Sequence, residues 1–404
     1  IVEGMTSKNT YTRPDTVLAV AGRDPDNNFG IVNPPVYHAS TILSPTMDKF
    51  ENRIPFEGYG YGRNGTPTQK ALEDAVAAIE GAHRSIAVQS GLGAVTGAIV
   101  GFLKSGDHML VTDNAYGPGK VFAEVELAAW GITLRTYDAM DPADLARKIG
   151  PKTRLVWLEA AGSITLEYPD IPALVAQVRQ ANAARSGGRP IITALDNTWG
   201  AGIAFQPFDQ GVDVSIQALT KYPSGGADVL MGSVITRDPD LHRQILLTRM
   251  RLGLGVGAND VELVLRGLPS MALRYHAQDT STRELAAWMQ QQPGVARVLH
   301  PALPDSPGHA AWKRDATAAA CLFSVVFDAA IPQARVDAFC DSLRLFRLGW
   351  SWAGPVSLCA PYKLSSIRSQ GWSDAGALVR FAIGLESVDD LRADLAQALH
   401  ALQT

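Results

Sequence analysis

Cysteine is scarce in this chain. Only three cysteines occur among 404 residues, at positions 321, 340 and 359, and no two of them form a CxxC pair. An odd and widely spaced set excludes the disulfide framework of a small secreted domain. We therefore expect a reducing compartment, by default the cytoplasm, with Cys321, Cys340 and Cys359 as buried apolar side chains.

Charged residues and long apolar runs are also limited. Charged residues make up 19% of the chain and the formal net charge is −4, so no basic field would recruit nucleic acid or anionic lipid. Apolar stretches such as residues 94–103 contain Gly and Thr and are too short for a membrane span. No signal-peptide pattern follows Met5, which we expect to be the natural start, with residues 1–4 as a remnant.

The eight histidines form no HxxxH or HxH pair, and we predict no metal site. A small molecule is the expected ligand.

The apolar pattern divides the chain into three parts. Residues 1–64, rich in Pro, Asn and Gly, predict an extended arm that lies on another surface, such as a second subunit. Residues 65–267 predict βαβ units and a mostly parallel sheet covered on both faces, and residues 268–404 predict a smaller α+β domain. The strands expected in the large domain are 85–89, 108–112, 133–137, 154–158, 191–195, 214–219 and 231–236. The other main expected elements are helices at 68–80, from 93, at 121–130, 171–185, 270–291 and 332–343, and strands at 322–327 and 379–383.

Three polar segments stand at the ends of expected strands. Residues 89–94 (QSGLGA) join a strand to a helix, where small residues let a ligand approach the free amides of the helix N-terminus. Asp196 and Lys221 follow two further strands, at the edge of an α/β sheet where ligands bind. Each has a purely structural interpretation as well: a Gly-rich turn, a capping Asp and a solvated lysine. Residues 89–94 match neither GxGxxG nor a Walker loop, which disfavours dinucleotides and nucleoside triphosphates.

The three segments together meet the needs of pyridoxal phosphate. Amides would hold the phosphate, a carboxylate would pair with the ring nitrogen, and an amine would bond the aldehyde. A partly buried lysine has a lowered pKa and forms a Schiff base readily. The combination predicts that Lys221 carries pyridoxal phosphate and that Asp196 holds its ring nitrogen.

Four motifs carry a resemblance to a known family. Residues 59–68 (YGYGRNGTPT) resemble its Y-x-R-x-G-x-P-T segment, residues 90–94 its phosphate loop, residues 196–198 its D-N-T and residues 220–222 its T-K-Y. In this order and spacing, the chain resembles the pyridoxal-phosphate-dependent enzymes of cysteine and methionine metabolism over nearly its whole length. It is most similar to the bacterial cystathionine β-lyases within that family, in stretches such as 162–167, 300–304 and 312–315. The resemblance implies a fold-type I, transferase-like α/β architecture with a mostly parallel seven-stranded sheet, a smaller C-terminal α+β domain and an extended N-terminal arm.

The resemblance also implies roles for single residues. Catalysis would fall to Lys221, as cofactor carrier and proton shuttle, and to Tyr116, which would also stack on the cofactor ring. The other residues expected to bind the cofactor are Asp196, Gly91, Leu92 and Thr220, together with Tyr61 and Arg63 from a neighbouring subunit. The substrate is expected to meet Arg380, which would grip its carboxylate, and Ser351, Trp352 and Tyr61. A shared site requires a dimer, and the family precedent is a homotetramer of two catalytic dimers.

The expected activity is the β-elimination of L-cystathionine to homocysteine, pyruvate and ammonia in methionine biosynthesis, with other cysteine S-conjugates as further substrates. The alternative within the family is γ-elimination or γ-replacement, against which Gly60, Gly62 and Trp352 are the sequence signals. A non-catalytic binding protein of the same fold is a third possibility, and it would be colourless. Two departures from the family pattern stand out: Ala218 replaces a common Ser, and Gly226 replaces the usual His.

Overall fold

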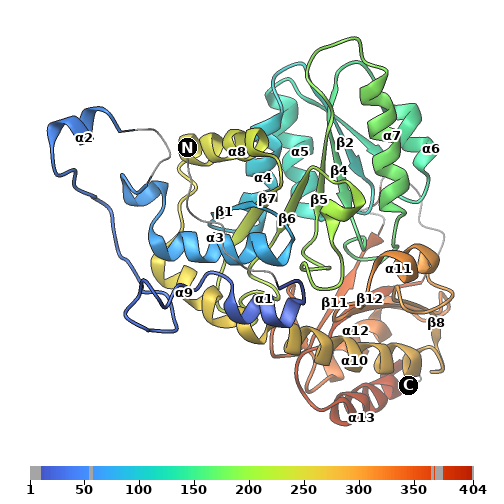
Figure 1. Ribbon diagram of the computed structural model, residues 1–404. Coiled ribbons are helices and arrows are strands. Elements are labelled where there is room, and N and C mark those ends of the chain that lie inside the picture. Colours follow the sequence, from blue (N-terminus) through green and yellow to red (C-terminus); the bar gives the residue numbers. More distant parts are fainter. Residues whose placement is uncertain (1–10, 54–57, 365–367, 369–375, 403–404) are drawn as a thin grey trace.

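The computed structural model describes residues 11–53, 58–364, 368 and 376–402, and it contains two sheets (Figure 1). The larger sheet has seven strands in the order β1-β7-β6-β5-β4-β2-β3. Strand β7 runs antiparallel to both of its neighbours, and the other strand pairs are parallel. The bounds are β1 Arg84–Val88, β2 His108–Thr112, β3 Thr133–Tyr137, β4 Thr153–Glu159, β5 Ile192–Asp196, β6 Val214–Gln217 and β7 Gly232–Thr236.

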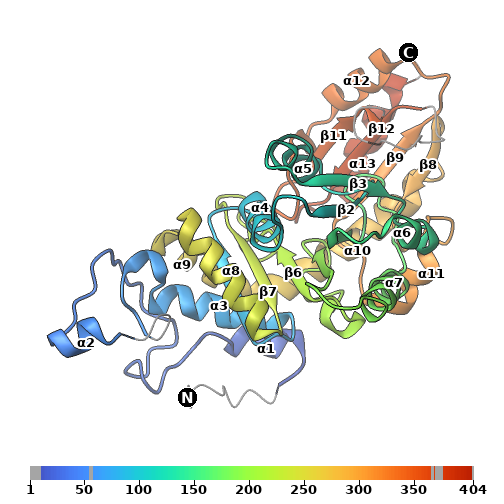
Figure 2. The same ribbon diagram turned by 90° about the horizontal axis from the view of Figure 1, so that it is seen from above.

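Helices cover both faces of the larger sheet (Figure 2). Along β4, Leu155 and Trp157 pack into one core and Val156 and Leu158 into another, which is why the strand reads as a continuous apolar run. Helices α4, α5 and α8 contribute to the first core, and α1, α3 and α7 to the second. The bounds are α1 Pro14–Val20, α3 Pro67–Ile79, α4 Gly91–Phe102, α5 Gly117–Ala129, α6 Pro142–Lys148, α7 Ile171–Ala183 and α8 Pro239–Leu252.

The C-terminal part of the chain has a core of its own, separate from the two cores of the larger sheet. It surrounds a five-stranded sheet in the order β10-β11-β12-β9-β8. Cys340 and Cys359 lie in this core, Cys321 lies in the core of the larger domain, and all three are buried and free, as predicted. No helix in the described part of the chain is long and apolar enough to cross a membrane. The bounds are α9 Ala258–Gly267, α10 Met271–Met289, β8 Val295–Leu299, α11 His309–Asp315, β9 Leu322–Phe327, α12 Gln333–Ser342, β10 Arg347–Leu348, β11 Leu358–Tyr362, β12 Leu378–Ala382 and α13 Val388–Ala398.

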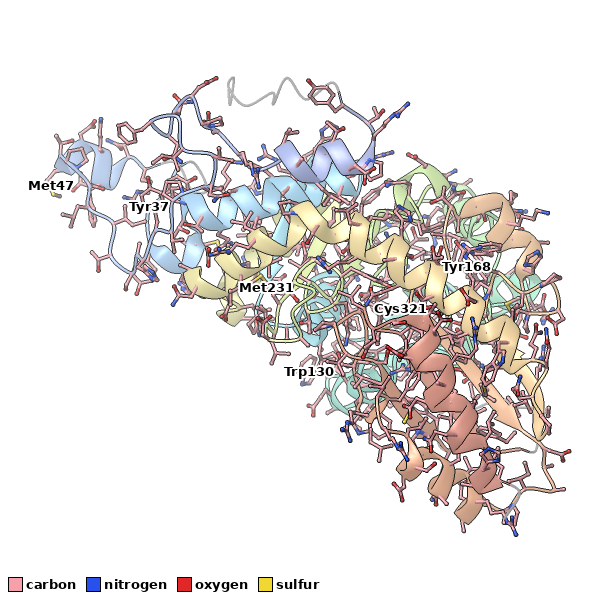
Figure 3. All side chains as sticks on the ribbon, turned by 90° about the horizontal axis from the view of Figure 1, so that it is seen from below. Tyr37, Met47, Trp130, Tyr168, Met231 and Cys321 are labelled. Carbon is pink, nitrogen blue, oxygen red and sulfur yellow. The ribbon has the colours of Figure 1, made fainter. Side chains whose placement is uncertain are left out.

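The N-terminal segment extends away from the two sheets (Figure 2). Helix α1 docks on the rest of the chain and buries Val17 and Leu18. Beyond it, helix α2 (Met47–Glu51) is short, and large apolar side chains face solvent: Phe29 is 96% exposed and Leu43 is 85% exposed. Figure 3 shows Met47 at the far end of this segment, remote from Cys321.

The prediction of a mostly parallel seven-stranded sheet with a smaller second domain is confirmed. Strands β2, β3 and β9 have the predicted bounds. Helices α1, α2, α6, α8, α9, α11 and α13 were not expected. Helix α8 shows the reason, because Ile245 and Arg249 are its buried residues and it carries little apolar periodicity. The division at residues 64/65 and 267/268 stays a prediction, since α9 leads through a 3-10 turn at Leu268–Ser270 directly into α10.

Candidate active site

The candidate site lies at the carboxyl ends of β5 and β6. Asp196 is the last residue of β5, and β6 ends at Gln217, four residues before Lys221. The two strands are parallel and place Asp196 beside Ile216. The turn that carries Lys221 therefore leaves the same edge of the sheet as Asp196, as the sequence predicted.

Lys221 meets the C-terminal part of the chain. Its Nζ donates a hydrogen bond to Ser351 Oγ at 2.7 Å and lies 5.4 Å from the ring centroid of Trp352. Burial, and after it the charge of Arg380, lowers the pKa of Lys221 from its ordinary 10.5 to about 8. About a tenth of this amine is then unprotonated at pH 7, far more than for an ordinary lysine, and the unprotonated form is the one that bonds an aldehyde or accepts a proton.

Asp196 is held by its own turn. Its Oδ1 accepts hydrogen bonds from the backbone N of Thr198 at 3.0 Å and from Thr198 Oγ1 at 2.5 Å. Burial raises the pKa of Asp196, while these bonds and the charge of Lys221 lower it. Both hydrogen bonds described for this carboxylate use Oδ1, so Oδ2 can pair with a cationic ring nitrogen.

The N-terminus of α4 provides an anion site next to the lysine turn. Ser90 caps the helix by accepting a hydrogen bond from the Gly93 amide at 2.9 Å. The amides of Gly91 and Leu92 lie in the first helical turn, where no intrahelical acceptor exists. A Cβ on Gly91 would stand 2.6 Å from the Cβ of Ala218, so both residues must be small for these segments to meet. Such an N-terminus attracts a phosphate.

The hydroxyl of Thr220 is engaged by the backbone of Met231. Its hydroxyl donates to the Met231 carbonyl at 3.2 Å and accepts from the Met231 amide at 3.0 Å. These bonds tie the lysine turn to the residue before β7. A phosphate contact of Thr220 stays a prediction.

Tyr116 directly precedes α5, and its side chain is 41% exposed. Its backbone N donates to Glu159 Oε2 at 2.8 Å, and Glu159 lies beside Asp196 in the register of β4 and β5. Burial raises the pKa of the Tyr116 phenol, and the charges of Asp196 and Glu159 raise it further. The phenol therefore stays protonated at neutral pH.

Arg380 lies on β12. It is 5% exposed, its Nη1 donates to the Ser163 carbonyl at 3.3 Å, and its Cζ lies 5.2 Å from the ring centroid of Tyr362. Its charge lowers the pKa of both Lys221 and Tyr116, so the three groups lie within electrostatic reach of one another. A planar guanidinium in this position can bind a carboxylate through two parallel hydrogen bonds.

Tyr61 and Arg63 lie elsewhere in their own chain. Tyr61 pairs with Thr41 in an isolated β-bridge, and Arg63 Nη1 donates to the Met250 carbonyl. The contacts described for these two residues include neither Lys221 nor Asp196. Within one chain, the structure thus brings together Lys221, Asp196, Tyr116, Gly91, Leu92, Arg380, Ser351 and Trp352, and not Tyr61 or Arg63.

The whole chain resembles known proteins. The family described as "Cys/Met metabolism PLP-dependent enzyme" matches residues 15–400. The chain belongs to this family. It is 37% identical over 389 residues to the cystathionine beta-lyase of Salmonella typhimurium, covering 95% of this chain and 97% of that relative. It is 34% identical over 404 residues to the L-alanine/L-glutamate racemase of Wolbachia pipientis, covering 96% of this chain and 98% of that relative. A solved cystathionine gamma synthase of Xanthomonas oryzae has a TM-score of 0.87 at 28% identity and covers 98% of this chain and 99% of its own.

A member of the Cys/Met metabolism family uses pyridoxal phosphate, and the residues present fit that group. The site combines a helix N-terminus for the phosphate, a partly buried carboxylate with one oxygen unused by its turn, and an amine of lowered pKa. Of the two departures from the family pattern, Ala218 fits against Gly91. At Gly226 a Cβ would stand 2.6 Å from Asp228 Oδ1, so any side chain there would displace Asp228.

The sequence analysis missed several residues around the site. Glu159 is the polar end of an apolar strand, and the signal that identified Asp196 would also have found it. Ser163 acts through its backbone carbonyl, which no residue type reveals. Arg368 pairs with Asp113 at 3.0 Å and with Glu167 at 2.8 Å, and so links the C-terminal part of the chain to loops of the large domain. No local sequence pattern predicts the pairing of Arg368 with these two carboxylates.

Proposed function

We propose that this chain is a pyridoxal-phosphate-dependent carbon-sulfur β-lyase that cleaves L-cystathionine to homocysteine, pyruvate and ammonia. The observation that carries the proposal is the Lys221 amine, whose pKa is about 8 and which is held 2.7 Å from Ser351 beside Trp352 and Arg380. The relative named cystathionine beta-lyase supports the reaction type. Pyridoxal phosphate, when bound, supplies the electron sink that makes the Cα proton removable.

The residues of the site divide the remaining tasks. Arg380 binds the substrate α-carboxylate and so orients Cα toward Lys221 Nζ. The neutral Lys221 amine takes the Cα proton. Asp196 pairs with the ring nitrogen of the cofactor. The protonated Tyr116 phenol donates a proton to the departing sulfur.

Two other reactions are distinguishable by the protons they move. A γ-elimination must also remove a proton from Cβ, which needs a base, whereas racemisation must return a proton to the opposite face of Cα, which needs an acid. A Tyr116 phenol of raised pKa is a poor second base. This favours β-elimination over γ-elimination, whereas racemisation, the activity named for one relative, needs a proton donor at that face and is tested below by its products.

We propose further that the protein is a cytoplasmic homotetramer of two catalytic dimers. The exposed apolar side chains of the N-terminal segment, such as Phe29 and Leu43, support an intersubunit contact. Tyr61 and Arg63, remote from their own Lys221, would then reach the phosphate in a neighbouring subunit. Gly91, Leu92 and Thr220 would hold the same phosphate from within the subunit.

Product analysis tests the proposed reaction. The purified holoenzyme is incubated with L-cystathionine, and the products are quantified against a Lys221→Ala control. Pyruvate with homocysteine in equal amounts supports the proposal. Cysteine with 2-oxobutyrate would establish γ-elimination, and the formation of D-alanine from L-alanine without cleavage of cystathionine would establish a racemase.

A further inference from the structure

A buried carboxylate, Glu80, lies on the face of the larger sheet that α3 covers. It directly follows α3 and is fully buried. Glu80 Oε1 accepts hydrogen bonds from Asn197 Nδ2 at 2.9 Å and from Gln217 Nε2, and its Oε2 accepts from Ser215 Oγ at 3.1 Å. One carboxylate thus receives three side-chain donors from the ends of β5 and β6.

The alternation of the two strands explains this arrangement. Ala194, Val214 and Ile216 pack in the core that α4 covers, whereas Leu195 packs in the core that α3 covers. Because successive residues of a strand face opposite sides, Asp196 belongs to the α4 side. Ser215, Gln217 and Asn197 belong to the α3 side, which is the side of Glu80.

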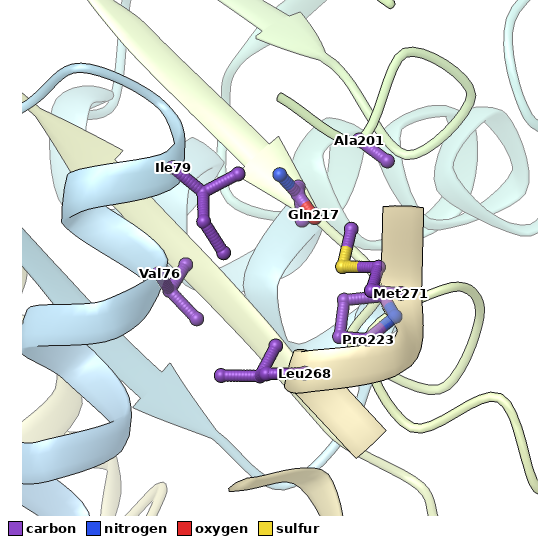
Figure 4. A pocket seen from close by; sticks show the side chains of 7 residues that line it. All are labelled: Val76, Ile79, Ala201, Gln217, Pro223, Leu268 and Met271. Atoms are coloured by element: carbon purple, nitrogen blue, oxygen red, sulfur yellow. The ribbon is translucent and has the colours of Figure 1, made fainter. Parts of the chain in front are cut away.

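The surroundings of Gln217 are otherwise apolar. Figure 4 shows its side chain in a pocket whose other lining residues are all apolar, namely Val76, Ile79, Ala201, Pro223, Leu268 and Met271. An amide in such a place is costly unless it is hydrogen-bonded. Glu80 provides that bond, which makes the position of the strand end depend on this carboxylate.

We propose that Glu80 is a positioning residue for the cofactor: it fixes, from behind the sheet, the two strand ends that present Asp196 and Lys221. Asn197 directly follows Asp196, and Gln217 precedes the turn that leads to Lys221. This inference rests on the cofactor roles proposed above for Asp196 and Lys221. Burial, and to a smaller extent the charge of Asp196, raise the pKa of Glu80 to about 7 against the effect of its three donors.

The chain supplies a matched control on the same helix. Glu73 of α3 is a largely buried carboxylate that accepts from Gln69 Nε2 at 2.7 Å and from the Ala87 amide at 2.9 Å. Its partners belong to α3 and β1, not to β5 or β6. Removing Glu73 therefore tests the loss of a comparable buried carboxylate without releasing the strand ends at the site.

The experiment compares Glu80→Leu, Glu80→Gln and Glu73→Leu in the full-length protein. The readouts are the dissociation constant of pyridoxal phosphate, measured by absorbance on the cofactor-free protein, and the urea midpoint of unfolding. We expect Glu80→Leu to weaken cofactor binding at least about tenfold, because two buried amide donors lose their acceptor and the strand ends shift. Glu80→Gln keeps the shape and an acceptor oxygen, and should stay within about threefold of the parent. Glu73→Leu should lower the urea midpoint and leave cofactor affinity within about twofold.

Cofactor affinities of Glu80→Leu and Glu73→Leu that change by the same factor would overturn the proposal, since Glu80 would then act on stability alone. If Glu80→Leu does not fold, Glu80→Asp and Glu73→Asp replace the pair, because the shorter side chain keeps the charge and withdraws it from the strand ends. Asp196→Asn is measured beside them. A wild-type turnover for Asp196→Asn would refute the proposed role of Asp196, whereas an impaired Asp196→Asn with a normal Glu80→Leu would refute the present inference alone.

Discussion

Replacing Lys221 by Met should stabilise the cofactor-free protein while abolishing its activity. The pKa of this amine falls from 10.5 to about 8 through burial and the charge of Arg380. Each pKa unit corresponds to about 1.4 kcal/mol, so keeping the amine protonated in the folded protein costs about 3 kcal/mol relative to the unfolded chain. Lys221→Met loses the bond to Ser351, a loss of about 1 kcal/mol. The expected net gain at pH 7 is therefore about 2 kcal/mol.

The sign of the pH dependence follows from the direction of the shift. Below pH 8 the amine is protonated in both states, and the folded protein bears the full cost. Between pH 8 and 10.5 the folded state releases its proton first, so the cost shrinks, and above 10.5 it vanishes. Urea unfolding of the cofactor-free parent and of Lys221→Met at pH 7 and pH 10 measures this, with the exposed Lys104→Met as control. A variant that is less stable than the parent at pH 7, or an advantage that does not shrink at pH 10, would refute the reasoning.

Three further changes test other parts of the site. Arg380→Leu should lower kcat/KM by about 30-fold, mainly through KM and with the cofactor absorbance retained, because the substrate carboxylate loses its partner; an unchanged KM for cystathionine would contradict this role. Arg368→Met should destabilise the protein by about 3 kcal/mol or more, because two buried carboxylates lose a cation, and an unchanged urea midpoint would argue against that pairing. Arg63→Ala mixed with Lys221→Ala should, after verified subunit exchange, regain part of the activity that each lacks; a mixture no more active than the two parents together would place Arg63 in its own subunit's site.

Much of the larger sheet could be predicted from the sequence because its signals are local. The strand at 108–112 (HMLVT) has three consecutive apolar residues at its centre because both faces are buried there, and the structure gives it the same bounds. Where a helix carries few buried residues, as α8 does, the periodic signal is absent and the prediction failed. Helix α1 was hidden for a similar reason: two buried residues, Val17 and Leu18, leave too short a pattern to recognise.

Two groups of the site, Asp196 and Lys221, could also be predicted from local sequence patterns. Asp196 and Lys221 each end an apolar strand, and parallel strands of one sheet must present their carboxyl ends at one edge. Order and spacing alone therefore determined that a carboxylate, an amine and a helix N-terminus meet there. The residue types then selected pyridoxal phosphate, since few ligands need all three groups.

Only the tertiary structure decided which distant groups complete that edge and set its energetics. Ser351 and Arg380 reach Lys221 from the C-terminal part of the chain, and the lowered pKa of the amine depends on the burial and charge that result. Glu80 was invisible in the sequence, because a glutamate at the end of a helix reads as solvated until packing places it against Asn197, Ser215 and Gln217. Local sequence patterns specify the helices and strands and the edge of the sheet at which the parallel strands end. The partners of a buried charge depend on how those elements pack, because desolvation and hydrogen bonding act through space and not along the chain.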